Sequence, residues 1–295
     1  MKLAHGAAVG ALVLVATGAH AGAQEPSPRS LQLKSEVFGN TRNLRVLLPI
    51  GYDAPENAAR RYPVFYFTDG IAAWNAWGVP AVVKELWGKG TIPAFIFVGI
   101  DNGGSTAESK APVRDRASEY LPYPDQTWVE APPEPRGERF PKFLFDEVMP
   151  LVNGALRTAP AGGCTGLAGA SYGAAIALYT AMKHPSRFGF LLLESPSLHI
   201  GDGRLLKDAA ATAVWPQRVY IGAGTAEGDT PEAQSRMTID ANTLRGTLDR
   251  AAPRPSALLT IKEGAKHWYD AWNERLPGAL TFLLSGDKGA RCAEP

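Results

Sequence analysis

The stretch Thr165-Gly-Leu-Ala-Gly-Ala-Ser171-Tyr-Gly-Ala-Ala175 decides the fold, because it places the pattern Gly-x-Ser-x-Gly around Ser171. The small, apolar run before the serine predicts a buried strand. Residues 172–182 are rich in Ala and Leu and contain no Pro, which predicts a helix. A strand, a sharp turn and a helix form the setting of a nucleophile elbow, in which a serine is held in a strained conformation among small neighbours. The stretch therefore predicts that Ser171 is a nucleophile exposed at the end of a strand.

Outside this stretch, short apolar runs alternate with segments of helical period. We expect strands at 31–38, 42–49, 62–68, 93–100, 164–169, 190–193, 219–221 and 257–261. We expect helices at 79–88, 139–151, 172–182, 204–212, 231–250 and 274–285. This alternation predicts the α/β class, with a mostly parallel central sheet and helices on both faces. Because no linker divides the chain, we expect one domain over 24–285, with its ligands beyond the C-terminal ends of the strands.

The first 23 residues have the layout of a secretory signal peptide. Lys2 is followed by an apolar run at 7–15 and by small residues at 19–23, where we expect cleavage. The run is too short to span a membrane, and no later run is long enough. Loss of Lys2 leaves 29 of the 30 basic side chains against 29 acidic ones, a balance that gives no attraction to nucleic acid or anionic membranes. We therefore expect a secreted or periplasmic protein without stable membrane insertion or a nucleic-acid partner.

The chain contains two cysteines, Cys164 and Cys292. In an exported protein they can pair, and the bond would pin the C-terminal tail (286–295) to the strand before Ser171. The alternative is a buried thiol at Cys164 and a frayed tail, and the sequence leaves both open.

Residues 103–137 form the longest segment without a clear period, and they include six prolines. A loop of this length in a compact domain is usually functional or mobile. Because it follows the end of a strand, we place it over the site as a pocket wall or a lid. A solvated excursion far from the chemistry is the alternative.

A nucleophilic serine needs a base, and two of the five histidines lie in the signal peptide. His184 follows the elbow helix and is interpreted as a turn residue. His199 follows a strand end and can approach the pocket. His267 follows the last predicted strand, where the base lies in folds with the chain order serine, acid, histidine, so we favour His267.

The acid that orients the base should lie between Ser171 and His267 at the C-terminal end of a strand. Glu227 and Asp229 follow the strand at 219–221, and Glu194 ends the preceding strand. Each of them can also be an ordinary surface carboxylate. We favour Glu227 over Asp229, and both over Glu194.

The oxyanion hole needs two backbone N–H donors. One should come from Tyr172, the residue after the nucleophile. The other should come from Ile71 in the loop after the strand at 62–68, where Gly70 lets the backbone turn toward the substrate.

A set of short sequences, taken together, resembles a known family. They are Tyr62-Pro-Val with Asp69-Gly, Val98-Gly-Ile-Asp-Asn102, Arg116-Ala-Ser-Glu-Tyr-Leu-Pro122, the elbow, Ser195-Pro-Ser197, and His267-Trp268 with Trp272 and Leu276-Pro277. Over about 31–284 the chain is similar to the putative-esterase group of α/β-hydrolases, which includes enterochelin-esterase-like and feruloyl-esterase-like serine esterases. The resemblance implies an α/β-hydrolase fold and a triad of Ser171, Glu227 and His267. One departure is Ala174-Ala175 after the elbow, where a further Gly is common.

These observations predict an exported serine carboxylic-ester hydrolase that works through an acyl-enzyme. No metal-ligand cluster or phosphate loop is visible in the sequence, and we expect no cofactor. The alternatives are an acyltransferase or a peptidase with the same triad, and a secreted binding protein with an inactive site. The oligomeric state is not predicted.

The expected substrate is a small-molecule or polymer-linked ester, with a short or an aromatic acyl group such as a feruloyl or catecholate ester. Trp74, Trp128 and Trp268, together with Gly70, are the candidate contacts, because tryptophan rings stack on aromatic groups. Core packing explains tryptophans equally well, above all Trp272. Arg114 and Arg116 can meet an acidic substrate, although we favour a structural pair of Arg116 with Glu119.

Overall fold

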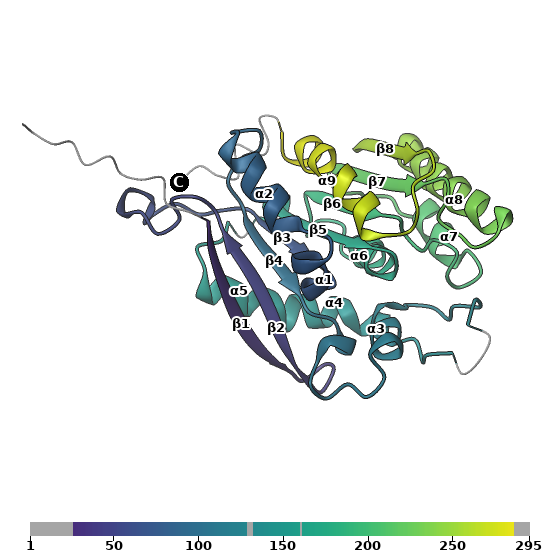
Figure 1. The fold of residues 1–295 in the computed structure, drawn as a ribbon, viewed down its shortest axis with the longest axis horizontal. Coiled ribbons are helices and arrows are strands. Elements are labelled where there is room, and N and C mark those ends of the chain that lie inside the picture. The colour runs from purple at the N-terminus through teal and green to yellow at the C-terminus, as the bar shows by residue number, and fades with distance from the viewer. Residues whose placement is uncertain (1–25, 129–131, 160, 286–295) are drawn as a thin grey trace, which may run out of the picture.

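An eight-stranded sheet runs through the part of the chain that the structure, a computed structural model, describes: residues 26–128, 132–159 and 161–285 (Figure 1). The strands are β1 (Ser27–Ser35), β2 (Asn40–Leu48), β3 (Val64–Phe67), β4 (Ile96–Ile100), β5 (Thr165–Ala170), β6 (Phe190–Glu194), β7 (Arg218–Gly224) and β8 (Ser256–Lys262). Their order in the sheet is β1-β2-β4-β3-β5-β6-β7-β8. β1, β2 and β4 pair antiparallel, and all pairs from β4 to β8 are parallel. The predicted mostly parallel sheet is confirmed.

Helices cover both faces of this sheet (Figure 1). They are α1 (Gly70–Asn75), α2 (Val79–Gly88), α3 (Pro112–Tyr120), α4 (Phe140–Lys142), the π-helical turn Phe143–Val148, α5 (Met149–Ala155), α6 (Tyr172–Lys183), α7 (Arg204–Ala210), α8 (Pro231–Arg250) and α9 (Tyr269–Leu284). Short 3-10 turns lie at Pro55–Asn57, Gly103–Ser105, Gly137–Arg139 and Gly162–Cys164. None of the helices within the described ranges is long and apolar enough to cross a membrane.

Two apolar clusters lie on opposite faces of the sheet. Helices α1, α2 and α9 pack on one face, and α3 to α8 pack on the other. Neighbouring residues of a strand point to opposite faces, so that Val46 belongs to one cluster and Leu47 to the other. Both sides of the central strands are therefore buried, which explains why these strands appear in the sequence as continuous apolar runs.

Helices α1 and α3 were not predicted from the sequence. Helix α1 has only six residues, too few to show a period. Helix α3 lies inside the segment 103–137, and three of its four buried residues are Ser118, Glu119 and Tyr120. Because its buried face is largely polar, the apolar period that marks most helices is missing.

The strand register brings the C-terminal ends of β5, β6 and β7 to one edge of the sheet. Ala170 lies beside Glu194, and Glu194 lies beside Gly222. The residues that follow these strands therefore emerge together, as expected for the ligand-binding edge of such a sheet.

The first 23 residues and the tail 286–295 lie outside the described residues, so the predicted signal peptide remains a prediction. The same holds for the pairing of Cys164 with Cys292, because Cys292 belongs to that tail.

Candidate active site

Ser171 occupies the turn between β5 and α6 with φ 59° and ψ −128°, a strained conformation for a residue with a side chain. The turn is possible because glycines stand two residues before and two residues after the serine. A Cβ added at Gly169 would lie 2.3 Å from the carbonyl carbon of Gly173, and one added at Gly173 would lie 2.3 Å from Oγ1 of Thr68. Strand and helix therefore approach each other more closely than any side chain permits. This geometry confirms the predicted elbow.

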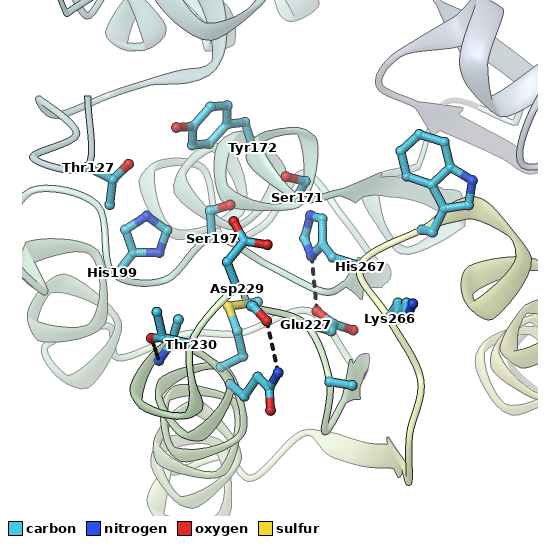
Figure 2. Close-up of a pocket in the computed structure, with 16 residues that line it drawn as sticks. Thr127, Ser171, Tyr172, Ser197, His199, Glu227, Asp229, Thr230, Lys266 and His267 are labelled. Atoms are coloured by element: carbon cyan, nitrogen blue, oxygen red, sulfur yellow. Dashed lines mark hydrogen bonds and ion pairs between the residues drawn. The ribbon is translucent and has the colours of Figure 1, made fainter. Parts of the chain in front are cut away.

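His267 and Glu227 meet beside Ser171. Nδ1 of His267 lies 3.0 Å from Oε2 of Glu227. Figure 2 shows the imidazole between this carboxylate and the hydroxyl of Ser171. The His267 ring packs edge-on against Trp272, with 5.2 Å between ring centroids, and this contact helps to fix its orientation. The carboxylate of Glu227 is fully buried, whereas the imidazole is one-third exposed toward the cavity. The structure thus brings together the serine, base and acid that the sequence favoured.

The other candidate acids and bases divide into two that line the cavity and two that do not. Asp229 is exposed and lines the same cavity. Glu194 is fully buried and pairs with Arg275. His184 ends α6 and packs against Phe145, with 4.6 Å between ring centroids. His199 does approach the pocket, on the side opposite His267 (Figure 2).

The site opens into a cavity of about 910 Å³. It is lined by Thr127, Ser171, Tyr172, Ser197, His199, Ala226, Glu227, Gly228, Asp229, Thr230, Ala233, Gln234, Met237, Lys266, His267 and Trp268. One wall is therefore the segment 103–137, through Thr127, and another is the first turns of α8. An adjoining cavity of about 500 Å³ shares five of these residues and extends the cleft past His199. Within the described ranges, no group of three or more His, Cys, Asp or Glu side chains could hold a metal ion.

Asp125 anchors the segment 103–137 to the elbow. Its carboxylate accepts the hydroxyl of Tyr172, which in turn accepts the indole N–H of Trp128 at 3.0 Å. Nε2 of His199 lies 3.5 Å from the same carboxylate. Burial opposes the charge on Asp125, but hydrogen bonds from His199, Tyr172 and Thr127 outweigh it and hold the pKa of this carboxyl below its usual range. Through Thr127, the segment 103–137 contributes to the lining of the cavity. Whether this segment moves as a lid stays a prediction.

A second anchor joins α3 to the end of β3. The guanidinium of Arg116 donates two hydrogen bonds of 2.7 Å to the carboxylate of Asp69. Glu119 instead pairs with Arg42 at 2.5 Å, with both side chains almost fully buried. The predicted pair of Arg116 with Glu119 is wrong, because each of these side chains pairs instead with a residue that is distant in the sequence. Arg114 donates to the carbonyl of Pro132 at 3.0 Å on the surface.

The two predicted oxyanion donors lie at helix N-termini. Tyr172 is the first residue of α6, and Ile71 is the second residue of α1. The N–H of Ile71 also faces the carboxylate of Asp101; burial raises the pKa of Asp101, while Arg45 and this N–H oppose the shift. Gly70 packs against β4, where an added Cβ would lie 2.5 Å from the carbonyl carbon of Gly99.

The predicted substrate contacts separate in the structure. Trp268 lines the cavity, and 61% of its surface is exposed. Trp128 reaches the site only through the hydroxyl of Tyr172. Trp74 packs against Phe97 with 5.9 Å between centroids, and neither Trp74 nor Gly70 belongs to the cavity lining. Thr127, Ser197 and the face of α8 also line the cavity and were not predicted as site residues, although Ser197 belongs to one of the short sequences that resemble the family.

A protein-family model described as Putative esterase matches residues 35–283. Among curated proteins, the uncharacterized protein YbbA of Bacillus subtilis (strain 168) is 20% identical over 258 residues, covering 86% of this chain and 97% of YbbA.

Solved structures with the same fold include three hydrolases. An IroE-like serine hydrolase from Shewanella oneidensis matches with a TM-score of 0.71 and 19% identity, over 88% of this chain and 82% of that chain. A ferulic acid esterase matches with a TM-score of 0.65 and 16% identity, over 88% of this chain and 98% of that chain. Ferric enterobactin esterase from Salmonella typhimurium matches with a TM-score of 0.67 and 20% identity, over 88% of this chain and 59% of that chain. The family model covers most of the chain, and the chain therefore belongs to the Putative esterase family and is a carboxylic ester hydrolase of the α/β-hydrolase fold.

Proposed function

We propose that the chain is an exported serine esterase in which Ser171 is the nucleophile, His267 the general base and Glu227 the acid that orients the base. The observation that carries this proposal is the 3.0 Å contact between Nδ1 of His267 and Oε2 of Glu227, with Ser171 in the same cavity. A carboxylate on Nδ1 fixes the tautomer that leaves Nε2 free to accept a proton.

The reaction proceeds in two halves. Nε2 of His267 takes the proton of Ser171 as Oγ attacks the ester carbonyl, and the buried carboxylate of Glu227 stabilises the imidazolium that forms. The proton then passes to the leaving alcohol, and an acyl-enzyme remains on Ser171. Water attacks this ester with His267 again as base, which releases the acid and restores the serine.

The negative oxygen of each tetrahedral intermediate is stabilised by backbone N–H groups. Tyr172 is the first proposed donor, because it directly follows the nucleophile at the start of α6. Ile71 is the proposed second donor, although its N–H also faces Asp101.

The substrate is proposed to be an ester with a short or an aromatic acyl group. The exposed ring of Trp268 at the cavity offers one face on which an aromatic group can stack. A panel of acetyl, feruloyl and catecholate esters tests this, and added alcohol acceptors would reveal transfer in place of hydrolysis. Export is proposed from residues 1–23, and N-terminal sequencing of protein recovered outside the cytoplasm should begin at Gly22 or Gln24.

The test of the triad is hydrolysis of p-nitrophenyl acetate. The wild-type protein should turn it over and should be labelled by a fluorophosphonate probe. Ser171→Ala should abolish both while its circular dichroism spectrum is unchanged. Equal turnover by a folded Ser171→Ala variant would refute the assignment.

A further inference from the structure

The two carboxylate oxygens of Glu227 have separate partners. Oε2 faces His267, whereas Oε1 accepts the hydroxyl of Ser195 at 2.6 Å and the N–H of Gly224 at 2.6 Å. Rotation of the carboxylate moves both oxygens, so turning Oε2 away from His267 would break the two hydrogen bonds at Oε1. The contacts of Oε1 therefore decide where Oε2 lies.

The neighbours of the Ser195 hydroxyl determine the direction in which it donates its hydrogen bond. The indole N–H of Trp272 donates to Oγ of Ser195 at 2.8 Å, and Nη2 of Arg275 lies 3.4 Å from the same atom. Indole and guanidinium groups donate hydrogen bonds and do not accept them. The proton of Ser195 must therefore go to Glu227, the one acceptor among these neighbours.

The backbone of Ser195 is shaped for this contact. It directly follows β6 with φ 44°, a left-handed conformation that is uncommon for a residue with a side chain. Its N–H bonds the carbonyl of Gly222 at 2.9 Å, while the carbonyl of the preceding Glu194 accepts the N–H of Ser171 at 3.0 Å. Ser195 is thus locked between the strand that carries the nucleophile and the strand that leads to the acid.

Arg275 shares its charge between two buried carboxylates. Its Nε donates to Oε1 of Glu194 at 2.5 Å, and its Nη2 lies 3.6 Å from Oε1 of Glu227. Burial raises the pKa of Glu194 to about 8, and the nearby Glu227 adds to this shift, while Arg275 opposes it. The guanidinium of Arg275 therefore lies between the two carboxylates and within reach of both.

We infer that Ser195 is a positioning residue for ester hydrolysis: its hydroxyl, directed by Trp272 and Arg275, holds Glu227 in the orientation that places Oε2 on His267. The inference rests on the proposed triad and adds a buried layer behind it. It needs no contact between Ser195 and the substrate.

The test compares Ser195→Ala with Ser195→Gly, measured as kcat and KM for p-nitrophenyl acetate. Both variants lose the hydroxyl, but glycine also accepts the left-handed backbone without strain, so Ser195→Gly should fold even if Ser195→Ala does not. We expect kcat to fall roughly 10- to 100-fold, by analogy with the loss seen when the hydrogen-bond partners that orient a metal ligand are removed. KM should stay within about twofold of the wild-type value, because substrate binding is untouched.

Ser35→Ala is the matched control. Ser35 is also buried, and its hydroxyl donates to a glutamate, Glu147, at 2.6 Å, but it lies on β1 at the edge of the sheet. This variant should lose stability and keep its kcat. A folded Ser195→Gly variant with kcat within twofold of an active wild type would overturn the inference and leave the triad standing.

A double-mutant cycle with Trp272→Phe tests the direction of the hydroxyl. Trp272→Phe should lower kcat by a larger factor in the wild-type background than in Ser195→Gly, because the partner of the indole N–H is already gone in that variant and only the packing of Trp272 against His267 is left to lose. Additive losses would contradict the proposed route through Ser195. If the wild-type protein itself hydrolyses no ester, the proposed function fails, and this inference fails with it.

Discussion

Backbone strain in the described chain is concentrated at the site. Four residues other than glycine have positive φ: Asp69, Ser171, Ser195 and Asp202. Ser171 is the proposed nucleophile, Ser195 contacts the proposed acid, and Asp69 precedes the helix that carries Ile71. Each such conformation costs on the order of 1–3 kcal/mol and persists only where surrounding contacts impose it. The folding energy of the molecule is thus used in part to hold individual residues in reactive positions.

Glu227→Gln should lower kcat by about 10³–10⁴-fold, because an amide on Nδ1 allows the imidazole tautomer that cannot accept the serine proton. Asp229→Asn should reduce kcat far less, since Asp229 lies exposed in the cavity wall. Steady-state kinetics on p-nitrophenyl acetate gives both values. A larger loss for Asp229→Asn would assign the acid to Asp229.

The free energy of unfolding should fall with rising pH, because the buried Glu194 loses its proton. Its pKa is about 8 in the folded protein against 4.5 for an unperturbed glutamate, so the folded state binds its proton more tightly. This contribution is complete below pH 4.5 and is lost as pH rises toward 8. Glu194→Gln cannot ionise and should lack the decline.

Urea unfolding at pH 5, 6.5 and 8 measures this difference between wild type and Glu194→Gln. Glu85→Gln, which removes an exposed carboxylate paired with Lys89, is the control and should show no such trend. A difference that does not change with pH would show that Glu194 is ionised throughout the range.

At the scale of elements, the contact between β5 and α6 limits what the sequence can contain. An alanine at Gly169 would drive its Cβ into the backbone of Gly173, so strand and helix must separate. The elbow depends on this approach, and separation would move Ser171 away from His267.

Gly169→Ala should therefore destabilise the protein by about 1–3 kcal/mol, as overpacking does, and should also reduce kcat. Gly278→Ala is the matched substitution, because Gly278 lies within α9 with open space at its Cβ position. It should stabilise the protein by roughly 0.5–1 kcal/mol with kcat unchanged. Thermal melting and ester hydrolysis of both variants check the pair, and a fully active Gly169→Ala protein would contradict the close approach.

At the scale of the molecule, one sheet joins both apolar clusters. Because alternate residues of each central strand belong to opposite clusters, neither face can lose its packing while the other stays intact. We expect a single heat-induced transition, with coincident midpoints in far-UV circular dichroism and tryptophan fluorescence. Trp215 reports on one cluster and Trp87 on the other. Two separate midpoints would show that the halves unfold independently.

Much of the fold was predictable because its signals are local. Helix α8 and helix α2 have the predicted bounds, and each of the eight strands overlaps a predicted one, with bounds within three residues except at β1, which begins four residues early. Helix α9 begins at Tyr269, five residues before the predicted start, because its first turns carry Asp270, Asn273 and Glu274 in place of an apolar period.

The candidate triad was predictable because each member follows the end of a strand, and chain order then sets the roles. The layer behind it was not. Ser195 and Arg275 meet Glu227 across 32 and 48 positions of the chain, and no local pattern marks such a meeting. The same reason explains the wrong pairing of Arg116, whose partner Asp69 lies 47 positions away.

The walls of the cavity and its reactive centre come from different parts of the chain. Thr127 belongs to the segment 103–137, and Gln234 and Met237 belong to α8, whereas Ser171 and Ser195 are fixed by the ends of central strands. Exchanging wall residues alters which esters fit without disturbing the atoms that cleave them. The scaffold is therefore evolvable. Libraries of variants confined to these two walls should yield new ester selectivities while the residues that cleave the ester stay the same.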